Sequence, residues 1–538
     1  GENPVEALIA LYNQGRLAEV VERTNALVEI YPEEIVLFNI LGAANAGLNR
    51  FDAAIESYNR AIRIDPGVAA LHNNLGSAQQ DKGDLAAAIA SFGKALELDP
   101  DYAEAHSGLG GALKDSGDFP AAINSYNRAL AINPDFAEAL NNLGNAYREQ
   151  GDFPAAVERY KRALAIRGDY AEAHYNLGRA LQETGDVPAA IESYRSALAI
   201  DKDFVAAHNS LGGAFRVSGD LDSAIESYTS AIYLSPDYAG YHFNLGAALK
   251  DKGDFDAAIE CYAHALQLRP DFAEAHRNLG HALKEKGDYA GAIERYKLSL
   301  EIKPDDVEAR DNLGGAYFDS GGYEDALESY DRADTPKARA DSLACLYALG
   351  RYDEFERRVQ DNQELDKTNL RVASVCSFAS DQIGRDIFHP FCKDPLDFIK
   401  FGHVRDHTDD SDDFIDALDA ELSQAPAVWE PVMHTTVHGF HTHGNLFETS
   451  SVNIARLEGA IKQEMSAYFE KFKAAPCLLM QMWPRGLNIT GWSVRLRQYG
   501  FQSSHIHPAG WLSGVVYVKL VESANKDEGA IVFQLRPY

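Results

Sequence analysis

Two histidines near the end of the sequence have the type and spacing that could bind a metal ion. His505 and His507 are separated by one residue in the segment His505-Ile506-His507-Pro508, which follows a short apolar run. Alternate side chains of a β-strand lie on the same face, so both imidazoles could approach one ion such as iron. The pair therefore predicts two metal ligands, and a third is needed. Spacing alone favours the alternative, two surface histidines beside a turn.

A second group of histidines precedes this pair, with spacings of four, three and two residues. The neighbouring glycines, Gly439 and Gly444, predict a loop, which does not hold side chains rigidly for metal binding. A third ligand from this group is therefore the less favoured alternative. The group consists of His434, His438, His441 and His443.

Short strands and two helices are the elements that must position His505 and His507. Apolar runs at 477–483, 491–500, 512–520 and 529–535 predict strands, and alternation is clearest at 492–499. Residues 369–384 and 448–472 have the pattern of helices. Several short strands at close spacing are typical of a sandwich or barrel, so residues 361–538 predict an α+β domain.

The motifs around the two histidines resemble the 2-oxoglutarate/Fe(II) oxygenase family. The similar segments are Tyr499-Gly500, the motif at 505–508 and residues 512–518, with 391–398 and 444–447 upstream. The resemblance covers roughly 385–538 and implies a partial double-stranded β-helix, which is jelly-roll-like. It also implies Fe(II) and 2-oxoglutarate as cofactors and hydroxylation of an unactivated C–H bond.

The resemblance carries over residue by residue only in part. His505 matches the first iron ligand of the family, whereas His507 stands where relatives place Asp or Glu. The distal histidine and the cation that binds 2-oxoglutarate lie further along in the family than Tyr538, the last residue here. The resemblance therefore implies a domain truncated at its C-terminus, and the catalytic residues stay unknown.

The rest of the chain is organised by a repeat of 34 residues. Apolar residues recur at helical spacing, and a glycine and often a proline end the two helices, so each unit predicts a helical hairpin. Such units bury their apolar faces only by stacking, which predicts an all-α solenoid. The repeat is marked by nine Leu-Gly pairs, at 41–42, 75–76, 109–110, 143–144, 177–178, 211–212, 245–246, 279–280 and 313–314.

This pattern resembles the tetratricopeptide repeat (TPR). Residues 1–360 are then a TPR superhelix of about ten to eleven hairpins, with divergent end units at 5–31 and 337–360. In that family the first helix of each hairpin lines a concave groove. The array is also similar to that of O-GlcNAc transferases, in which an asparagine ladder holds protein substrates.

Two ladders of polar residues follow the repeat. Asparagine precedes the Leu-Gly pair in six units, where its carboxamide could bind the backbone of an extended peptide or could merely solvate the groove. Histidine recurs once per unit at 72, 106, 174, 208, 242 and 276, too sparsely for a metal site, so packing is expected. The asparagine ladder consists of Asn74, Asn142, Asn176, Asn244, Asn278 and Asn312.

Composition limits the partners. Asp and Glu number 81 against 50 Lys and Arg, a formal charge of −31, which argues against nucleic acid or an anionic membrane as partner. The five cysteines show no metal-binding or disulfide spacing. No apolar run is long enough to span a membrane and no signal peptide is visible, so the cytoplasm is the default location. The sequence leaves open whether the chain forms a homo-oligomer.

Together these features predict a 2-oxoglutarate- and Fe(II)-dependent oxygenase, a protein or peptide hydroxylase whose TPR groove recruits the substrate. The alternative is a non-catalytic TPR scaffold that binds peptides and has a degenerate C-terminal domain. Glycosyl transfer ranks last, because no glycine loop for nucleotide phosphates follows residue 360.

Overall fold

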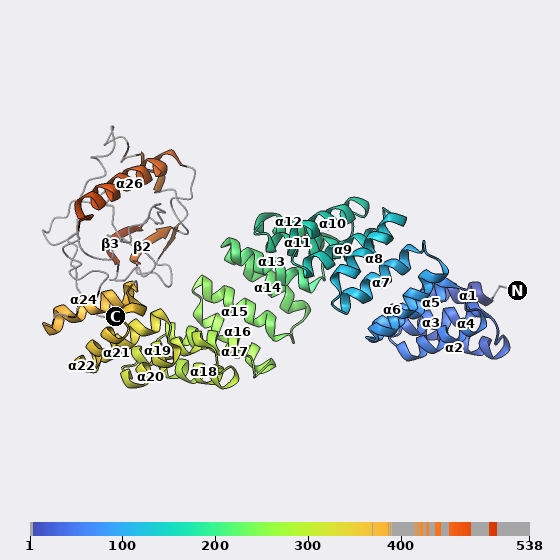
Figure 1. Ribbon diagram of the computed structural model, residues 1–538, viewed down its shortest axis with the longest axis horizontal. Helices are drawn as coiled ribbons and strands as arrows, with labels where there is room; N and C mark the ends of the chain where they lie inside the picture. Colours follow the sequence, from blue (N-terminus) through green and yellow to red (C-terminus); the bar gives the residue numbers. More distant parts are fainter. Residues whose placement is uncertain are drawn as a thin grey trace. The chain divides into compact units, whose positions relative to one another are not determined.

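The structure, a computed structural model, describes residues 4–367 and 369–385 and several segments after them (Figure 1). Those later residues are 387, 389, 414, 417–418, 420–422, 427–429, 436–442, 451–474 and 494–502. The chain divides into two compact units, Gly1–Asn244 and Leu245–Tyr538.

Unit 1 is built from helical hairpins. A shorter turn separates the two helices of a hairpin, and another turn leads to the next hairpin. The helices are α1 (Pro4–Asn13), α2 (Leu17–Ile30), α3 (Ile35–Gly47), α4 (Phe51–Ile64), α5 (Ala69–Lys82), α6 (Leu85–Leu98), α7 (Ala103–Asp115), α8 (Phe119–Ile132), α9 (Ala137–Glu149), α10 (Phe153–Ile166), α11 (Ala171–Glu183), α12 (Val187–Ile200), α13 (Val205–Ser218) and α14 (Leu221–Leu234). Helix α15 (Ala239–Lys252) contains the boundary with unit 2.

Unit 2 continues the hairpins and then changes to a mixed architecture. Its helices are α16 (Phe255–Leu268), α17 (Ala273–Glu285), α18 (Tyr289–Ile302), α19 (Val307–Asp319), α20 (Tyr323–Ala333), α21 (Pro336–Ala348), α22 (Tyr352–Asp361), α23 (Gln363–Asp366), α24 (Leu370–Ile383) and α26 (Val452–Phe472). Its strands are β1 (Ala427–Trp429), β2 (Thr436–Thr442) and β3 (Val494–Gln502).

A Gly-Asp pair makes the turn inside most hairpins. Gly117, for example, has a φ of +87°, a left-handed conformation that glycine adopts without steric cost. Asp118 then caps α8, because its carboxylate accepts a hydrogen bond of 3.1 Å from the backbone N–H of Ala121. The glycine ends one helix and the aspartate begins the next, which fixes the hairpin.

An aromatic ring packed on a glycine forms the core of the nine hairpins from α3–α4 to α19–α20. In the hairpin of α9 and α10, Tyr160 is fully buried between Ala156 and Ala163. A Cβ atom at Gly144 would lie 2.6 Å from the Tyr160 ring, so only glycine lets the two helices approach this closely. The Leu-Gly pair in the sequence therefore marks the close contact between the two helices.

The first helices of the hairpins lie on the inner side of each stack. In unit 1, α5 contacts α7, α7 contacts α9 and α9 contacts α11 across neighbouring hairpins. The second helices reach the next hairpin through its first helix, as α8 does with α9. The first-helix surface turned away from the second helices is called the inner face below.

The described part of the C-terminal segment contains an antiparallel sheet of order β1-β2-β3. Strand β3 and helices α24 and α26 confirm the strand expected at 491–500 and the helices expected at 369–384 and 448–472. The loop expected around Gly439 is wrong, because residues 436–442 pair with β1 on one side and β3 on the other. Gly439 lies at an irregularity in the pairing with β3. Glycine is common at such irregularities within strands, so it does not require a loop here.

Candidate functional site

All six asparagines of the predicted ladder lie on first helices, at α5, α9, α11, α15, α17 and α19. Each precedes by two residues the glycine that packs on the aromatic ring, as Asn142 precedes Gly144. Two residues correspond to about 200° around a helix, so the asparagine faces away from the second helix of its own hairpin and toward the preceding hairpin. Five of the six are half-buried, and Asn176 is buried.

Three ladder asparagines form hydrogen bonds to the preceding hairpin. The Nδ2 atom of Asn74 donates to Oδ1 of Asn39 at 3.0 Å. The same bond joins Asn176 to Asn141 at 3.0 Å and Asn244 to Asn209 at 2.8 Å. In each case the acceptor lies 35 residues earlier. These carboxamides link neighbouring first helices, a role that the sequence pattern did not suggest.

The other three ladder asparagines, Asn142, Asn278 and Asn312, have no asparagine 35 residues earlier. Asn142 accepts a long hydrogen bond of 3.5 Å from Asn141. Asn278 and Asn312 make no side-chain hydrogen bond to another of the described residues.

The gap in the ladder at Gly108 has a steric cause. A Cβ atom at Gly108 would lie 2.4 Å from the ring of Phe92 in the preceding hairpin. No asparagine fits at this position while the ring keeps its place. The interruption is therefore part of the packing between hairpins.

The histidine ladder is structural, as its spacing predicted. The Nε2 atom of each histidine lies within hydrogen-bond distance of the backbone oxygen six residues earlier, in the turn between hairpins. His242, for example, lies 2.7 Å from the oxygen of Pro236. Burial lowers the pKa of His276, which favours the neutral ring in this packed position.

Polar and charged side chains at the ends of the first helices also join neighbouring hairpins. Lys284 of α17 pairs with Asp319 of α19 at 2.9 Å, and Gln80 of α5 donates to Asp115 of α7 at 2.7 Å. Polar contacts at the ends of the first helices therefore also join neighbouring hairpins.

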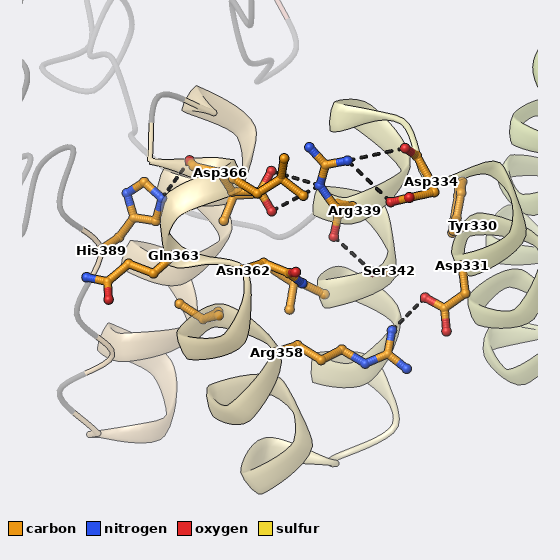
Figure 2. Close-up of a pocket in the computed structure, with 14 residues that line it drawn as sticks. Tyr330, Asp331, Asp334, Arg339, Ser342, Arg358, Asn362, Gln363, Asp366 and His389 are labelled. Atoms are coloured by element: carbon orange, nitrogen blue, oxygen red, sulfur yellow. Dashed lines mark hydrogen bonds and ion pairs between the residues drawn. The ribbon is translucent and has the colours of Figure 1, made fainter.

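A cavity of about 220 Å³ lies where α20, α21, α22 and α23 meet (Figure 2). Arg339 crosses it, with Nε donating to both carboxylate oxygens of Asp366 at 2.9 and 3.1 Å. Its Nη1 also donates to Oδ1 of Asp334 at 3.3 Å. The ring of His389 lies 3.2 Å from the backbone oxygen of Asp366, and burial lowers the pKa of this histidine. These contacts anchor α23 to α21, and the charged groups lining the cavity are already paired.

The predicted metal ligands His505 and His507 lie outside the described residues. Of the second histidine group, His438 and His441 lie on β2, and His434 and His443 are outside the described part. Within the residues that the structure describes, no three His, Cys, Asp or Glu side chains gather in a way that could hold a metal ion. None of the described helices is long and apolar enough to cross a membrane.

The comparisons with protein families agree with the hairpin geometry. The family "TPR repeat" matches residues 42–83, 80–117, 110–147, 144–185, 246–287 and 280–321, and "Tetratricopeptide repeat" matches 175–239. This chain is a tetratricopeptide repeat protein. Repeats of this family are protein-interaction modules. At the other end of the TPR protein, residues 490–534 match the family described as "Putative 2OG-Fe(II) oxygenase".

Solved structures are similar to parts of the TPR protein. A crystal structure of MamA has 29% sequence identity and a TM-score of 0.30, and covers 31% of this chain and 97% of its own. The crystal structure of the APC/C hetero-tetramer Cut9-Hcn1 has 19% identity and a TM-score of 0.40, and covers 56% of this chain and 59% of its own. No curated protein sequence matches the chain.

Proposed function

We propose that this TPR protein is a 2-oxoglutarate- and Fe(II)-dependent oxygenase that hydroxylates a protein or peptide recruited by its repeats. The observation that carries the proposal is the match of residues 490–534 to an oxygenase family, because this segment contains His505 and His507. Strand β3 lies within the same segment and immediately precedes the histidines in the sequence.

The chemistry of the two side chains suits the proposed ion. Neutral imidazole nitrogen is a good ligand for iron, and oxygenases of this class complete the set with one carboxylate and leave positions open. Bound Fe(II) and 2-oxoglutarate would supply the oxidation of an unactivated C–H bond. His505 and His507 would bind the ion as neutral imidazoles, so protons would compete with Fe(II) and weaken its binding at acidic pH.

The repeats would hold the substrate. Each unit would offer carboxamides to a bound backbone, Asn142 in unit 1 and Asn278 and Asn312 in unit 2. A carboxamide offers both a donor and an acceptor, the pair that an extended peptide also offers at each residue. Such contacts depend little on the peptide sequence, which suits recruitment ahead of a separate reaction site.

Anaerobic calorimetry of Fe(II) binding to the full chain tests the enzymatic part. We expect binding that tightens when 2-oxoglutarate is present and that is lost in the double variant His505→Ala/His507→Ala. The matched control is His434→Ala/His443→Ala, which removes two histidines of the other group. Loss of Fe(II) binding only in this control would show that His505 and His507 are not the ligands. No Fe(II) binding to the wild-type chain would favour the function of a non-catalytic scaffold that binds peptides.

A further inference from the structure

Two exposed tyrosines flank the turn between α14 and α15. Tyr233, near the end of α14, is 85% exposed, and Tyr238, which immediately precedes α15, is 58% exposed. At intervals of 34 residues the position of Tyr233 holds Glu29, Arg63, Glu97, Ala131, Ala165, Ala199, Gln267 and Glu301. The rings at the position of Tyr238 are half-buried in the other hairpins: Tyr102, Phe136, Tyr170, Phe204 and Phe272. Single exposed apolar residues are ordinary, but two large rings at one turn form a patch.

The residues around this turn hold the ring of Tyr238 in place. A Cβ atom at Gly240 would lie 2.6 Å from the ring, so the ring rests against the first turn of α15. The ring centroid of Tyr241 lies 4.5 Å from that of Tyr238. The backbone oxygen of Pro236, within the turn, lies 2.7 Å from Nε2 of His242. A ring that is exposed and already fixed loses little conformational entropy when a partner binds to it.

Two equivalent turns show which chemical group packs on a ring at this position. The guanidinium carbon of Arg167 lies 3.5 Å from the ring centroid of Tyr170, three residues later. Arg269 lies in the same way 3.4 Å from the ring centroid of Phe272. In the turn before α15, the position of these arginines holds Ser235. The array therefore stacks a guanidinium on this ring where the chain supplies one, and the α14–α15 turn lacks it.

The charge around the turn favours a cation from outside the chain. Among the residues that the structure describes, no Lys or Arg lies over the ring of Tyr233 or Tyr238. Asp237 is exposed between the two rings in the sequence, and a carboxylate accepts two N–H groups of a guanidinium at once. The planar guanidinium stacks on aromatic rings, whereas the ammonium of lysine is compact and strongly hydrated. The net charge of −31 attracts basic segments in general, and the two rings select arginine.

We propose that the turn at residues 233–238 binds an arginine side chain of a basic segment in a partner protein, with the guanidinium stacked on Tyr238 beside Tyr233 and Asp237. Neither ring belongs to the inner face, because Tyr233 lies on a second helix and Tyr238 in a turn between hairpins. The inference therefore goes beyond the proposed function and does not depend on it.

Fluorescence anisotropy with two labelled peptides tests the inference. One peptide repeats Arg-Ser-Gly and the other repeats Lys-Ser-Gly, so they carry the same charge and differ in the planar group. Both are titrated with the full chain and with the double variant Tyr233→Ala/Tyr238→Val. The array itself has these residues at the equivalent positions, Ala199 and Val68, so the hairpins should fold in this variant.

A matched control and a second variant make the test specific. Ile30→Ala/Tyr31→Ala removes another exposed apolar pair, at the end of α2. Ser235→Arg places a guanidinium three residues before Tyr238, as in the two equivalent turns, so it should cover the ring and exclude the peptide. Ser235→Lys adds the same charge at the same position without the planar group.

We expect the wild-type chain to bind the arginine peptide about fivefold or more tightly than the lysine peptide, as stacking on two exposed rings predicts. Tyr233→Ala/Tyr238→Val should remove this preference, and Ile30→Ala/Tyr31→Ala should keep it. Ser235→Arg should weaken binding of the arginine peptide more than Ser235→Lys does.

Three results would overturn the inference. They are equal or absent binding of the two peptides by the wild-type chain, equal loss in both double variants, and equal effects of arginine and lysine at position 235. Fe(II) binding should be the same in all of these variants, so a failure at the turn is distinguishable from a failure of the proposed oxygenase.

Discussion

The buried tyrosines of the hairpins differ in what their hydroxyl groups contact. Tyr160 donates a hydrogen bond to Asn145 at 2.7 Å, and Tyr194 donates to Gln182 at 3.1 Å. The hydroxyls of Tyr126 and Tyr296 are buried without a hydrogen-bond partner among the described residues. The ring packs on a glycine in each hairpin from α3–α4 to α19–α20, but the hydroxyl contributes only where an acceptor lies within reach.

Substitution to phenylalanine should separate these two cases. We expect Tyr126→Phe to leave the free energy of unfolding unchanged or to raise it, because a buried hydroxyl without a partner costs about 1–3 kcal/mol. Tyr160→Phe should destabilise the chain, by about 0.5–1.5 kcal/mol for the lost hydrogen bond. Urea unfolding of both variants beside the wild type measures the difference. A larger loss for Tyr126→Phe than for Tyr160→Phe would contradict the assignment of hydroxyl partners.

At the scale of elements, hydrogen bonds between asparagines join first helices that do not share a hairpin. The bond from Asn176 to Asn141 links α11 to α9, and Asn141 is fully buried. Such a bond acts on the interface between repeats, which in a stacked array contributes much of the stability. The ladder therefore has two parts, one that joins neighbouring hairpins and one without asparagine bonds between hairpins.

Alanine variants of neighbouring ladder positions should show this division. Asn176→Ala removes the donor and leaves Oδ1 of the buried Asn141 without it, so we expect a loss of about 1–3 kcal/mol in unfolding free energy. Asn142→Ala, at a half-buried position with no bond between hairpins, should change stability by less than about 0.5 kcal/mol. Chemical denaturation of the full chain distinguishes them, and equal losses would show that both asparagines are structural.

The sequence predicted the hairpins well because their signals are local and repeated. The Leu-Gly pair, the aromatic residue and the Gly-Asp turn all act within one hairpin, and each recurs in register. The bond from Asn176 to Asn141 was missed, because it depends on how two hairpins align and not on either hairpin alone. Strand β2 was missed for a related reason: its partner β3 lies more than fifty residues later, and Gly439 gave a loop signal.

At the scale of the whole molecule, the excess of acidic residues sets the balance of surface electrostatics. The chain has 81 acidic and 50 basic residues. Even if every basic residue were paired with an acidic one, a net charge of −31 would remain. Many of the described ion pairs are exposed, such as Lys94 with Glu97 at 2.8 Å. Exposed pairs contribute little each, whereas the repulsion within the excess charge acts over the whole surface.

Added salt should therefore stabilise the protein. At an ionic strength of about 0.1 M the Debye length falls to about 10 Å, which screens the repulsion between distant carboxylates. We expect the melting temperature to rise between low ionic strength and about 0.1 M sodium chloride, as measured by calorimetric scans at neutral pH. A fall in melting temperature over that range would mean that the attractive ion pairs outweigh the net repulsion.

The uniform step of 34 residues also bears on how the gene can change. An in-frame deletion of residues 144–177 would join Leu143 to Gly178 and restore a Leu-Gly pair at the junction. Gain or loss of one 34-residue unit would add or remove a whole hairpin, and every remaining ring would still meet its glycine. The number of hairpins can therefore differ between descendants of this gene while each residue keeps the same kind of neighbour.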